Sequence, residues 1–410
     1  MKTLIKSALI IDTKSPHHGK KRDVLMDKGR IVSIAAKMED AKAKVISGSG
    51  LCISPGWIDL KANFCDPGFE FKEDIESGLD AARKGGFKTV VLTISTLPVI
   101  DSKGSFEYIR KRASGSDIRL MAAACLSEKM EGKQLSEMFD LHQAGAVAFS
   151  DDKNNVSTEL MSRALEYSKN FGGLVMSFPF DQSLCQHGQI NEGPMSVSLG
   201  LKGIPNISEE LRVQRDIELL RYNGGRLHFT LISTAKSVDL IRKAKKEGLN
   251  VTCAVAAHQF SFLDEDMKSF DTHLKVLPPF RSKEDRKALI AGLKDGTINA
   301  ICSDHSPEDI EHKVREFDQA EFGINGIETA FCSAFTSLEK FLSIEELIAA
   351  LTSGPARVLG YDFSSIEEGQ PADVTVFSTT ENTTFHSLEM MSKSANNPFL
   401  GKTLRGKIIL

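Results

Sequence analysis

Five polar residues stand where short apolar runs end, and their types could do chemistry. Lys61 and Asn63 follow one such run, Asp151 and Asp152 follow another, and Asp304 follows a third. Carboxylates serve as acid–base groups and metal ligands, and they repel one another when they gather without a cation. A lysine among them can neutralise the carboxylates, act as a general base or form a Schiff base, or remain solvated without a partner. Which of these applies to Lys61 depends on the elements that position the five residues.

Short apolar runs alternate with helical periods through the middle of the chain. Eight runs alternating with helices predict a closed parallel (β/α)8 barrel rather than an open sheet. In such a barrel, Lys61 and the three aspartates lie at the mouth, where an ammonium would offset the carboxylates. We therefore favour a structural role for Lys61. The predicted strands are Cys52–Leu60, Thr89–Ile94, Ile118–Ala123, Ala146–Phe149, Leu174–Ser177, Leu227–Ile232, Asn250–Val255 and Asn299–Cys302. The predicted helices include Lys72–Lys84, Thr158–Asn170, Glu209–Tyr222, Ser237–Lys246 and Lys283–Leu293.

Both ends of the chain look β-rich. Leu4–Ile11 is apolar and β-prone, a hairpin pattern follows it, and strand patterns return at Ala372–Phe377 and Leu404–Leu410. We expect the two ends to pair into a small β-sandwich domain formed by residues 1–51 plus 356–410. Residues 52–355 would then form the barrel.

Composition limits the function classes. The 410 residues are 41% hydrophobic and 26% charged, which is ordinary for a globular protein. The net charge is −4 with both signs dispersed, so no basic surface predicts nucleic-acid binding. No apolar run approaches the roughly 20 residues that span a bilayer, and the first residues lack a secretory signal, which predicts a cytoplasmic protein without membrane contact. The seven cysteines form no C-x-x-C pair and are expected to be reduced.

Several motifs carry a family resemblance over nearly the whole chain. They include Ser54–Gly68, Pro278–Leu289, Ser303–Pro307, Phe322–Thr329 and Ser392–Phe399. In this order and spacing they resemble the dihydroorotase-type cyclic amidohydrolases. The resemblance implies a TIM barrel of the amidohydrolase type. It also implies, in active relatives, hydrolysis of a cyclic amide with one or two zinc ions.

The positions that hold metal and substrate in that family are largely changed here. The resemblance places its metal-binding histidines on Lys61, Asn63, Phe178 and Leu231. Carboxylates remain at Asp151 or its neighbour Asp152, and at Asp304, which matches the family's catalytic aspartate. Positions that bind substrate in the family fall on Cys65, Ser95, Leu277 and Glu308. His258 matches part of a family segment and is expected to be a core or loop histidine.

These changes predict a pseudoenzyme. One or two carboxylates without histidine hold zinc weakly, so we expect no metal cofactor. We expect a homo-oligomer, and the resemblance to degenerate relatives suggests aspartate transcarbamoylase as a protein partner in pyrimidine biosynthesis. The alternative is an active dihydroorotase or related cyclic amide hydrolase with an altered or metal-free site. A third option is a small-molecule sensor that uses the pocket in which active relatives bind their substrate.

Overall fold

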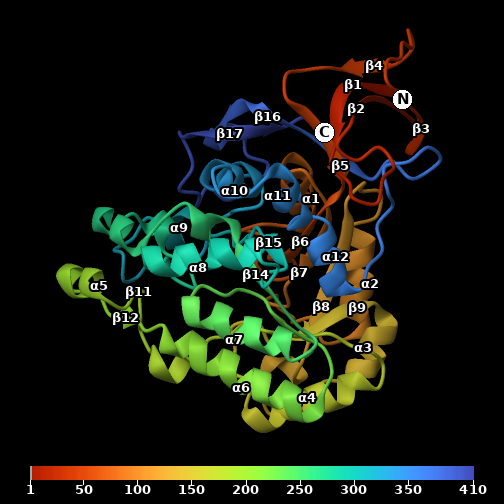
Figure 1. Cartoon of the computed structure of the whole chain (residues 1–410). Helices are drawn as coiled ribbons and strands as arrows, with labels where there is room; N and C mark the ends of the chain where they lie inside the picture. The colour runs from red at the N-terminus through yellow and green to blue at the C-terminus, as the bar shows by residue number, and fades with distance from the viewer. Residues whose placement is uncertain (1) are drawn as a thin grey trace.

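A computed structural model describes residues 2–410 and shows a parallel barrel of eight strands (Figure 1). Neighbouring strands are paired in parallel in the order β15-β14-β13-β10-β9-β8-β7-β6. Beyond β15, a parallel bridge between Ala62 and His305 brings the two edge strands together. The predicted (β/α)8 fold is therefore confirmed. The strands are β6 (Trp57–Ala62), β7 (Phe87–Leu92), β8 (Arg119–Cys125), β9 (Ala146–Ser150), β10 (Val175–Ser177), β13 (Leu227–Phe229), β14 (Val251–Ala256) and β15 (Ala300–Cys302).

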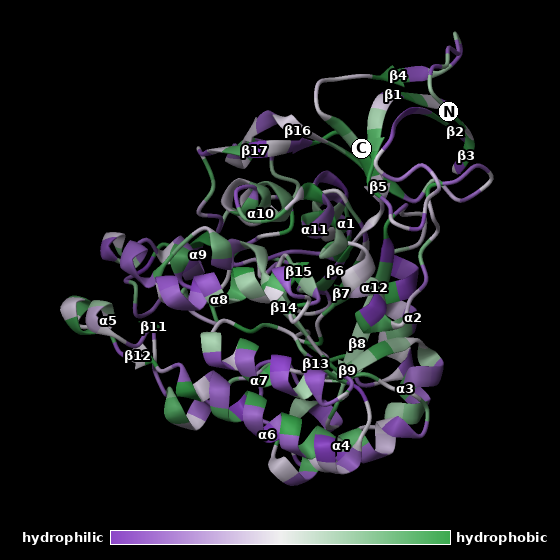
Figure 2. Ribbon diagram, viewed as in Figure 1, coloured by the Kyte–Doolittle hydropathy of each residue, from purple (hydrophilic) through white to green (hydrophobic). Residues whose placement is uncertain are grey.

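Helices surround the barrel and bury their apolar faces against it. In α7, for example, Val238, Ile241 and Ala244 are buried at helical spacing, while the outer face is hydrophilic (Figure 2). The helices of this layer are α1 (Ile75–Lys84), α2 (Lys103–Arg112), α3 (Met138–Ala144), α4 (Thr158–Lys169), α6 (Ile207–Asn223), α7 (Ala235–Lys246) and α8 (Lys283–Lys294). After the last barrel strand come α10 (Ala330–Leu338), α11 (Ile344–Ala349) and α12 (Ser353–Leu359).

Capping residues explain where two of the helices begin. The predicted start at Lys283 is confirmed, because the Ser282 side chain accepts a hydrogen bond from the backbone N–H of Asp285. The predicted start of α1 at Lys72 is wrong. Asp74 caps this helix by accepting from the backbone N–H of Ser77, so α1 begins at Ile75.

The two chain ends meet in a second sheet of seven strands. Its order is β17-β16-β5-β1-β2-β3, with β4 paired to β1. The antiparallel pair of β16 and β5 joins the C-terminal part of the chain to the N-terminal part. The boundaries of the two predicted domains remain a prediction. The strands are β1 (Thr3–Ile10), β2 (Lys21–Asp27), β3 (Arg30–Ala35), β4 (Lys44–Ile46), β5 (Leu51–Pro55), β16 (Val374–Thr384) and β17 (Thr403–Ile408).

The first predicted barrel strand, Cys52–Leu60, proves to be two strands in two sheets. β5 belongs to the terminal sheet and β6 to the barrel, with Gly56 between them. The Gly56 N–H donates to the carbonyl of Asp373 at 2.9 Å, and a Cβ at Gly56 would lie 2.6 Å from Cβ of Lys88. Glycine thus allows the close approach at which the chain passes from one sheet to the other.

The loops after the barrel strands form the face where the predicted site residues lie. They carry short elements: β11 (Ile190–Asn191), α5 (Pro194–Leu199) and β12 (Gly203–Ile204) after β10, and α9 (Ile310–Lys313) after β15. Among residues 2–410, the helices are all too short or too polar to cross a membrane.

Candidate functional site

A buried lysine lies between two carboxylates at the mouth of the barrel. Nζ of Lys61 is 3.0 Å from Oδ1 of Asp304 and 3.6 Å from Oδ1 of Asp152. All three side chains are at least nine-tenths buried. The bridge between Ala62 and His305 explains the first contact, because it sets the residues immediately before them, Lys61 and Asp304, side by side.

Lys61, Asp152 and Asp304 form a group that we call the Lys61 cluster. Their opposite charges stabilise one another. Burial alone would disfavour the ammonium, but the carboxylates of Asp152 and Asp304 raise the pKa of Lys61 above its ordinary value. Burial likewise opposes ionisation of Asp152, yet Lys61 and other donors lower the pKa of Asp152 below its usual range. Lys61 is therefore protonated at neutral pH, and a protonated amine has no lone pair for a Schiff base or for general-base work. The geometry supports the structural role predicted for it.

The two consecutive aspartates have different roles. Asp152, with a φ of 46°, contacts Lys61 and accepts a 2.7 Å hydrogen bond from Oγ of Ser95. Asp151, which we predicted at the metal-site position, is bonded elsewhere. Its carboxylate accepts from the backbone N–H groups of Leu126 and Ser127, at 3.0 and 2.9 Å, and from the Ser127 hydroxyl. The structure thus brings Asp152, and not Asp151, to Lys61.

An aromatic ring and an unpaired imidazole lie near the ammonium. The Phe178 ring centroid is 5.9 Å from Nζ of Lys61, and both Phe178 and Leu231 are buried. His258 is also buried, with its ring edge-on to Phe280, and neither ring nitrogen has a hydrogen-bond partner within residues 2–410. Burial lowers the pKa of His258 to about 4, so its imidazole is neutral. The chemical groups here are one ammonium, two carboxylates and a neutral imidazole.

Asn63 and His305 hold the backbone next to the cluster. The Asn63 N–H donates to the carbonyl of His305 at 2.8 Å, and its Oδ1 accepts from the N–H of Cys65 at 2.8 Å. The His305 ring faces away toward Glu73, with 3.4 Å between Nε2 and Oε2. Burial opposes ionisation of Glu73, but the nearby His305 ring and hydrogen bonds from Ser392 and Ser77 keep the pKa of Glu73 below its usual value. The pair of Glu73 and His305 connects the loop after β6 to the loop after β15.

The predicted substrate positions do not form one group. Ser95 joins the Lys61 cluster through Asp152. Burial raises the pKa of Cys65 to about 12, so this thiol is not a ready nucleophile. Oε2 of Glu308 is 2.7 Å from Nζ of Lys72, and burial raises the pKa of Glu308 although Lys72 opposes the rise.

Leu277, the remaining predicted substrate position, lines a cavity of its own. The cavity is apolar, has a volume of about 380 Å³ and is also lined by Phe180, Cys185 and Phe322. This cavity is formed by loops of the barrel mouth, and none of the charged residues of the cluster contributes to its lining.

Asp59 is a residue of this region that we did not predict. Its Oδ1 accepts from the N–H groups of Ser303, at 2.9 Å, and Lys61, at 3.3 Å, and its Oδ2 accepts from the Ser303 hydroxyl. Burial raises the pKa of Asp59 to about 6. These bonds fasten β6 to the end of β15 and so hold Lys61 against Asp304. The only sequence signal was an aspartate inside the apolar run Trp57–Leu60.

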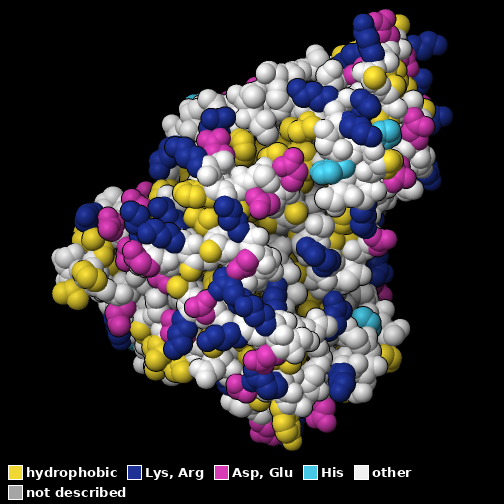
Figure 3. All heavy atoms as spheres, in the orientation of Figure 1, with side chains coloured by type: hydrophobic (Ala, Val, Ile, Leu, Met, Phe, Trp, Pro, Cys, Tyr) yellow, Lys and Arg dark blue, Asp and Glu magenta, His cyan; other side chains and the backbone are white. Residues whose placement is uncertain are grey.

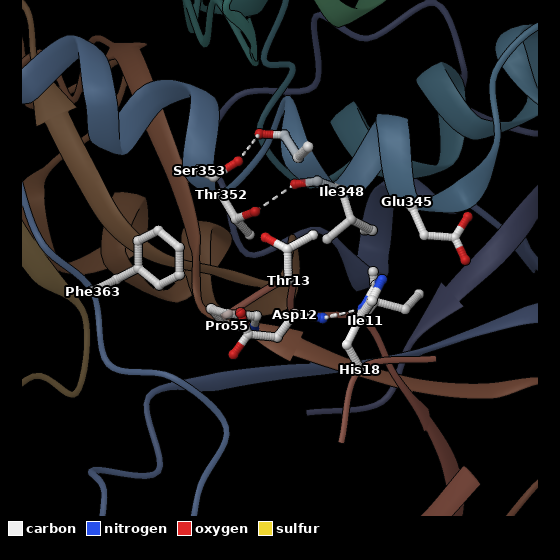
Figure 4. A pocket seen from close by; sticks show the side chains of 11 residues that line it. Ile11, Asp12, Thr13, His18, Pro55, Glu345, Ile348, Thr352, Ser353 and Phe363 are labelled. Atoms are coloured by element: carbon white, nitrogen blue, oxygen red, sulfur yellow. Dashed lines mark hydrogen bonds between the residues drawn. The ribbon is translucent and has the colours of Figure 1, made fainter. Parts of the chain in front are cut away.

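A second cavity lies between the terminal sheet and helices α11 and α12 (Figure 4). Asp12, His18, Glu345, Thr352 and Phe363 are among the residues that line it, and the backbone N–H of Asp12 donates to Nδ1 of His18 at 3.2 Å. Its volume is only about 30 Å³, which is room for a water molecule and not for an organic substrate.

Metal-binding side chains are not grouped in the part of the chain that the structure describes. Across residues 2–410, no three or more His, Cys, Asp or Glu side chains are arranged to hold an ion. His228, for example, is buried with Nδ1 2.8 Å from the Thr252 hydroxyl, and burial lowers the pKa of His228 to about 3.

Comparison with known proteins identifies relatives along the whole chain. Residues 50–237 match the family model described as dihydro-orotase-like. A dihydroorotase of Syntrophus aciditrophicus is 38% identical over 100% of this chain and 97% of the relative. A dihydroorotase of Acetivibrio thermocellus is 40% identical over 99% of this chain and 96% of the relative.

Solved structures support the fold alone, because their sequences are distant. An L-hydantoinase (dihydropyrimidinase) from Arthrobacter aurescens matches with a TM-score of 0.86 at 21% identity, covering 100% of this chain and 94% of that one. A D-hydantoinase (dihydropyrimidinase) from Thermus sp. matches with a TM-score of 0.82 at 22% identity, covering 99% and 93%.

Proposed function

Because this chain belongs to the dihydroorotase-like family, we propose that it is a non-catalytic dihydroorotase homologue that acts in pyrimidine biosynthesis by association. One observation carries the proposal: the Lys61 ammonium contacts the carboxylates of Asp304 and Asp152 at the barrel mouth. A cation covalently attached to the protein thus neutralises the carboxylates that would otherwise attract a metal ion.

The side chains at this position do not fit a catalytic zinc site. Such a site takes about three nitrogen, sulfur or oxygen ligands from the protein and keeps one position open. Lys61 is protonated and offers no lone pair, while Phe178 and Leu231 offer no donor atom at all. The donors that remain near Nζ are Asp152 and Asp304, which both already bind Lys61, and the neutral imidazole of His258. Within residues 2–410, no three His, Cys, Asp or Glu side chains are arranged to hold an ion. We therefore derive no metal-assisted step for this chain.

Two further parts of the proposal concern partners. Resemblance to degenerate members of the family favours aspartate transcarbamoylase as the protein that this chain assembles with. The proposal also includes a homo-oligomer of this chain. Co-purification of the chain with aspartate transcarbamoylase from the same organism, followed by sedimentation of the mixture, tests both. Separate sedimentation of the two proteins at micromolar concentration would contradict the association.

The second candidate is an active dihydroorotase or related cyclic amide hydrolase with an altered site. The observation that favours it is that relatives 38–40% identical over the full length carry the name dihydroorotase. Asp304 also occupies the position that the resemblance gives to the catalytic aspartate. Such an enzyme needs a mechanism that does not use the family's metal-binding and substrate-binding positions that are changed in this chain.

Metal content and turnover together distinguish the two candidates. The protein is purified without chelator, offered zinc, separated from free metal and measured by atomic emission. We expect less than about a tenth of an equivalent of zinc and no hydrolysis of dihydroorotate above a chelator-treated blank. One or two equivalents of zinc with hydrolysis would establish the second candidate. Hydrolysis without metal would also overturn the non-catalytic assignment.

A further inference from the structure

A groove with an apolar floor and a basic rim runs along one outer helix of the barrel. It lies between α8 and the end of α10 and has a volume of about 470 Å³. Phe260, Ile290 and Phe341 form apolar parts of its lining, and Phe341 is 50% exposed. The rim is formed by the cations Lys283, Arg286, Lys287 and Lys294. Figure 3 shows basic, acidic and apolar side chains together on this face of the molecule.

The four cations of the rim have no acidic partners. Within residues 2–410, no carboxylate lies within the 4.0 Å that defines an ion pair from any of them. The side chain of Arg286 donates only to the carbonyl of Phe260, at 3.4 Å. By contrast, Arg242 on neighbouring α7 pairs with both Asp239 and Asp295. Unpaired positive charge on one face is notable in a chain whose net charge is −4.

The spacing of these residues defines the shape of the groove. Positions 283, 286, 287, 290, 291 and 294 recur every three or four residues, so they form one stripe along α8. Eleven residues of helix rise about 16 Å, which corresponds to three turns of a partner helix. The cations lie toward both ends of the stripe, and Ile290 and Ala291 lie between them.

We propose that this groove, defined by its residues above, docks an acidic amphipathic helix of a partner protein. Charge complementarity selects the occupant: the rim requires anionic side chains, and the floor requires an apolar face at helical spacing. A purely anionic polymer would leave Phe341 and Ile290 without a counterpart. The proposal does not depend on the state of the Lys61 cluster, so it can fail while the proposed function stands.

A defined peptide tests the groove on the full-length protein. The probe is a fluorescein-labelled, blocked peptide of about 14 residues, built of Leu, Ala and Glu, with leucines at i, i+3, i+4 and i+7. Binding is followed by fluorescence anisotropy at low and at physiological salt. The groove variants are Lys283→Glu with Lys287→Glu, and separately Phe341→Gln. The matched control, Lys243→Glu with Lys246→Glu, changes two exposed lysines of α7 by the same charge.

We expect the wild-type protein and the α7 control to bind the peptide equally. The charge variant should weaken binding at least about tenfold, and Phe341→Gln at least about threefold. Circular dichroism establishes that each variant is folded. Protection from hydrogen exchange should appear on α8 and residues 337–341.

Several results would overturn the proposal. They are no binding by the wild type, equal loss in the α7 control, or a charge effect without a Phe341 effect. Two further results assign the groove to another occupant. One is self-association of the wild type that Lys283→Glu with Lys287→Glu abolishes. The other is binding to phosphatidylserine vesicles while the peptide does not bind.

Discussion

Nζ of Lys61 lies 3.0 Å from Oδ1 of Asp304, although 243 residues separate them in the chain. The contact exists because β6 and the residues after β15 are neighbours in the closed barrel, where Ala62 bridges His305. Hydrogen bonds between Asp59 and Ser303 also join β6 to the residues after β15. The position of the ammonium is therefore fixed by backbone pairing as well as by charge.

Removing the ammonium should destabilise the fold. Lys61→Met keeps the length of the side chain but leaves Asp152 and Asp304 buried without a cation. We expect a loss of about 3–5 kcal/mol in the free energy of unfolding, measured by urea denaturation. Lys133→Met, which removes an exposed lysine, is the control and should change little.

A triple variant separates charge from shape at this cluster. Adding Asp152→Asn and Asp304→Asn to Lys61→Met should recover most of the lost stability, because the unpaired carboxylates are then gone. If the triple variant is as unstable as Lys61→Met alone, packing rather than charge explains the effect.

Restoring histidines tests why zinc is not expected. Lys61→His with Asn63→His should bind less than about a tenth of an equivalent of zinc and give no dihydroorotate hydrolysis, since Phe178 and Leu231 still supply no donor. Adding Phe178→His and Leu231→His should raise the bound zinc toward one equivalent, measured by atomic emission on the folded variant. Zinc-dependent turnover by the first pair alone would falsify our account of the site.

Asp151 should matter for stability rather than for the Lys61 cluster. Asp151→Ala leaves the buried N–H groups of Leu126 and Ser127 without their acceptor, so we expect a loss of about 3 kcal/mol by urea denaturation. The comparison is Asp152→Asn added to Lys61→Met. We expect this double variant to be more stable than Lys61→Met alone, because it removes a buried carboxylate that has lost its cation. Equal destabilisation by both changes would contradict the separate roles of the two aspartates.

His228 should make stability depend on pH. Its pKa is lowered to about 3 by burial, whereas the unfolded chain has an ordinary histidine pKa near 6.5. The unfolded state therefore binds more protons below that pH, and stability is lost as the pH falls from about 6.5 toward 3. Between pH 6.5 and 5 this amounts to about 2 kcal/mol.

The variant His228→Asn removes this titration while keeping an acceptor near Thr252. The difference in unfolding free energy between wild type and variant should therefore narrow by about 2 kcal/mol from pH 6.5 to pH 5. Parallel pH profiles from urea denaturation would show that His228 is not neutral in the folded protein.

The barrel itself could be predicted from local pattern. Each barrel strand is a short apolar run between helical periods, and this alternation is visible without any long-range contact. The capping of α8 by Ser282 was equally local. The break between β5 and β6 at Gly56 could not be predicted from local pattern. It depends on the approach of Lys88 and Asp373 from distant parts of the chain.

At the site, the resemblance of the sequence to dihydroorotases predicts that Lys61, Asn63, Phe178 and Leu231 stand at the family's metal-binding positions. Residue types could not establish which aspartate meets the lysine, because Asp151 and Asp152 are adjacent and identical in type. The left-handed backbone at Asp152, with a φ of 46°, accompanies the turn that sends one carboxylate to Lys61 and the other to the amides of Leu126 and Ser127. The sequence by itself determined which chemical groups are present. Only the tertiary structure decided which of them are in contact, because those contacts depend on strand pairing across the closed barrel.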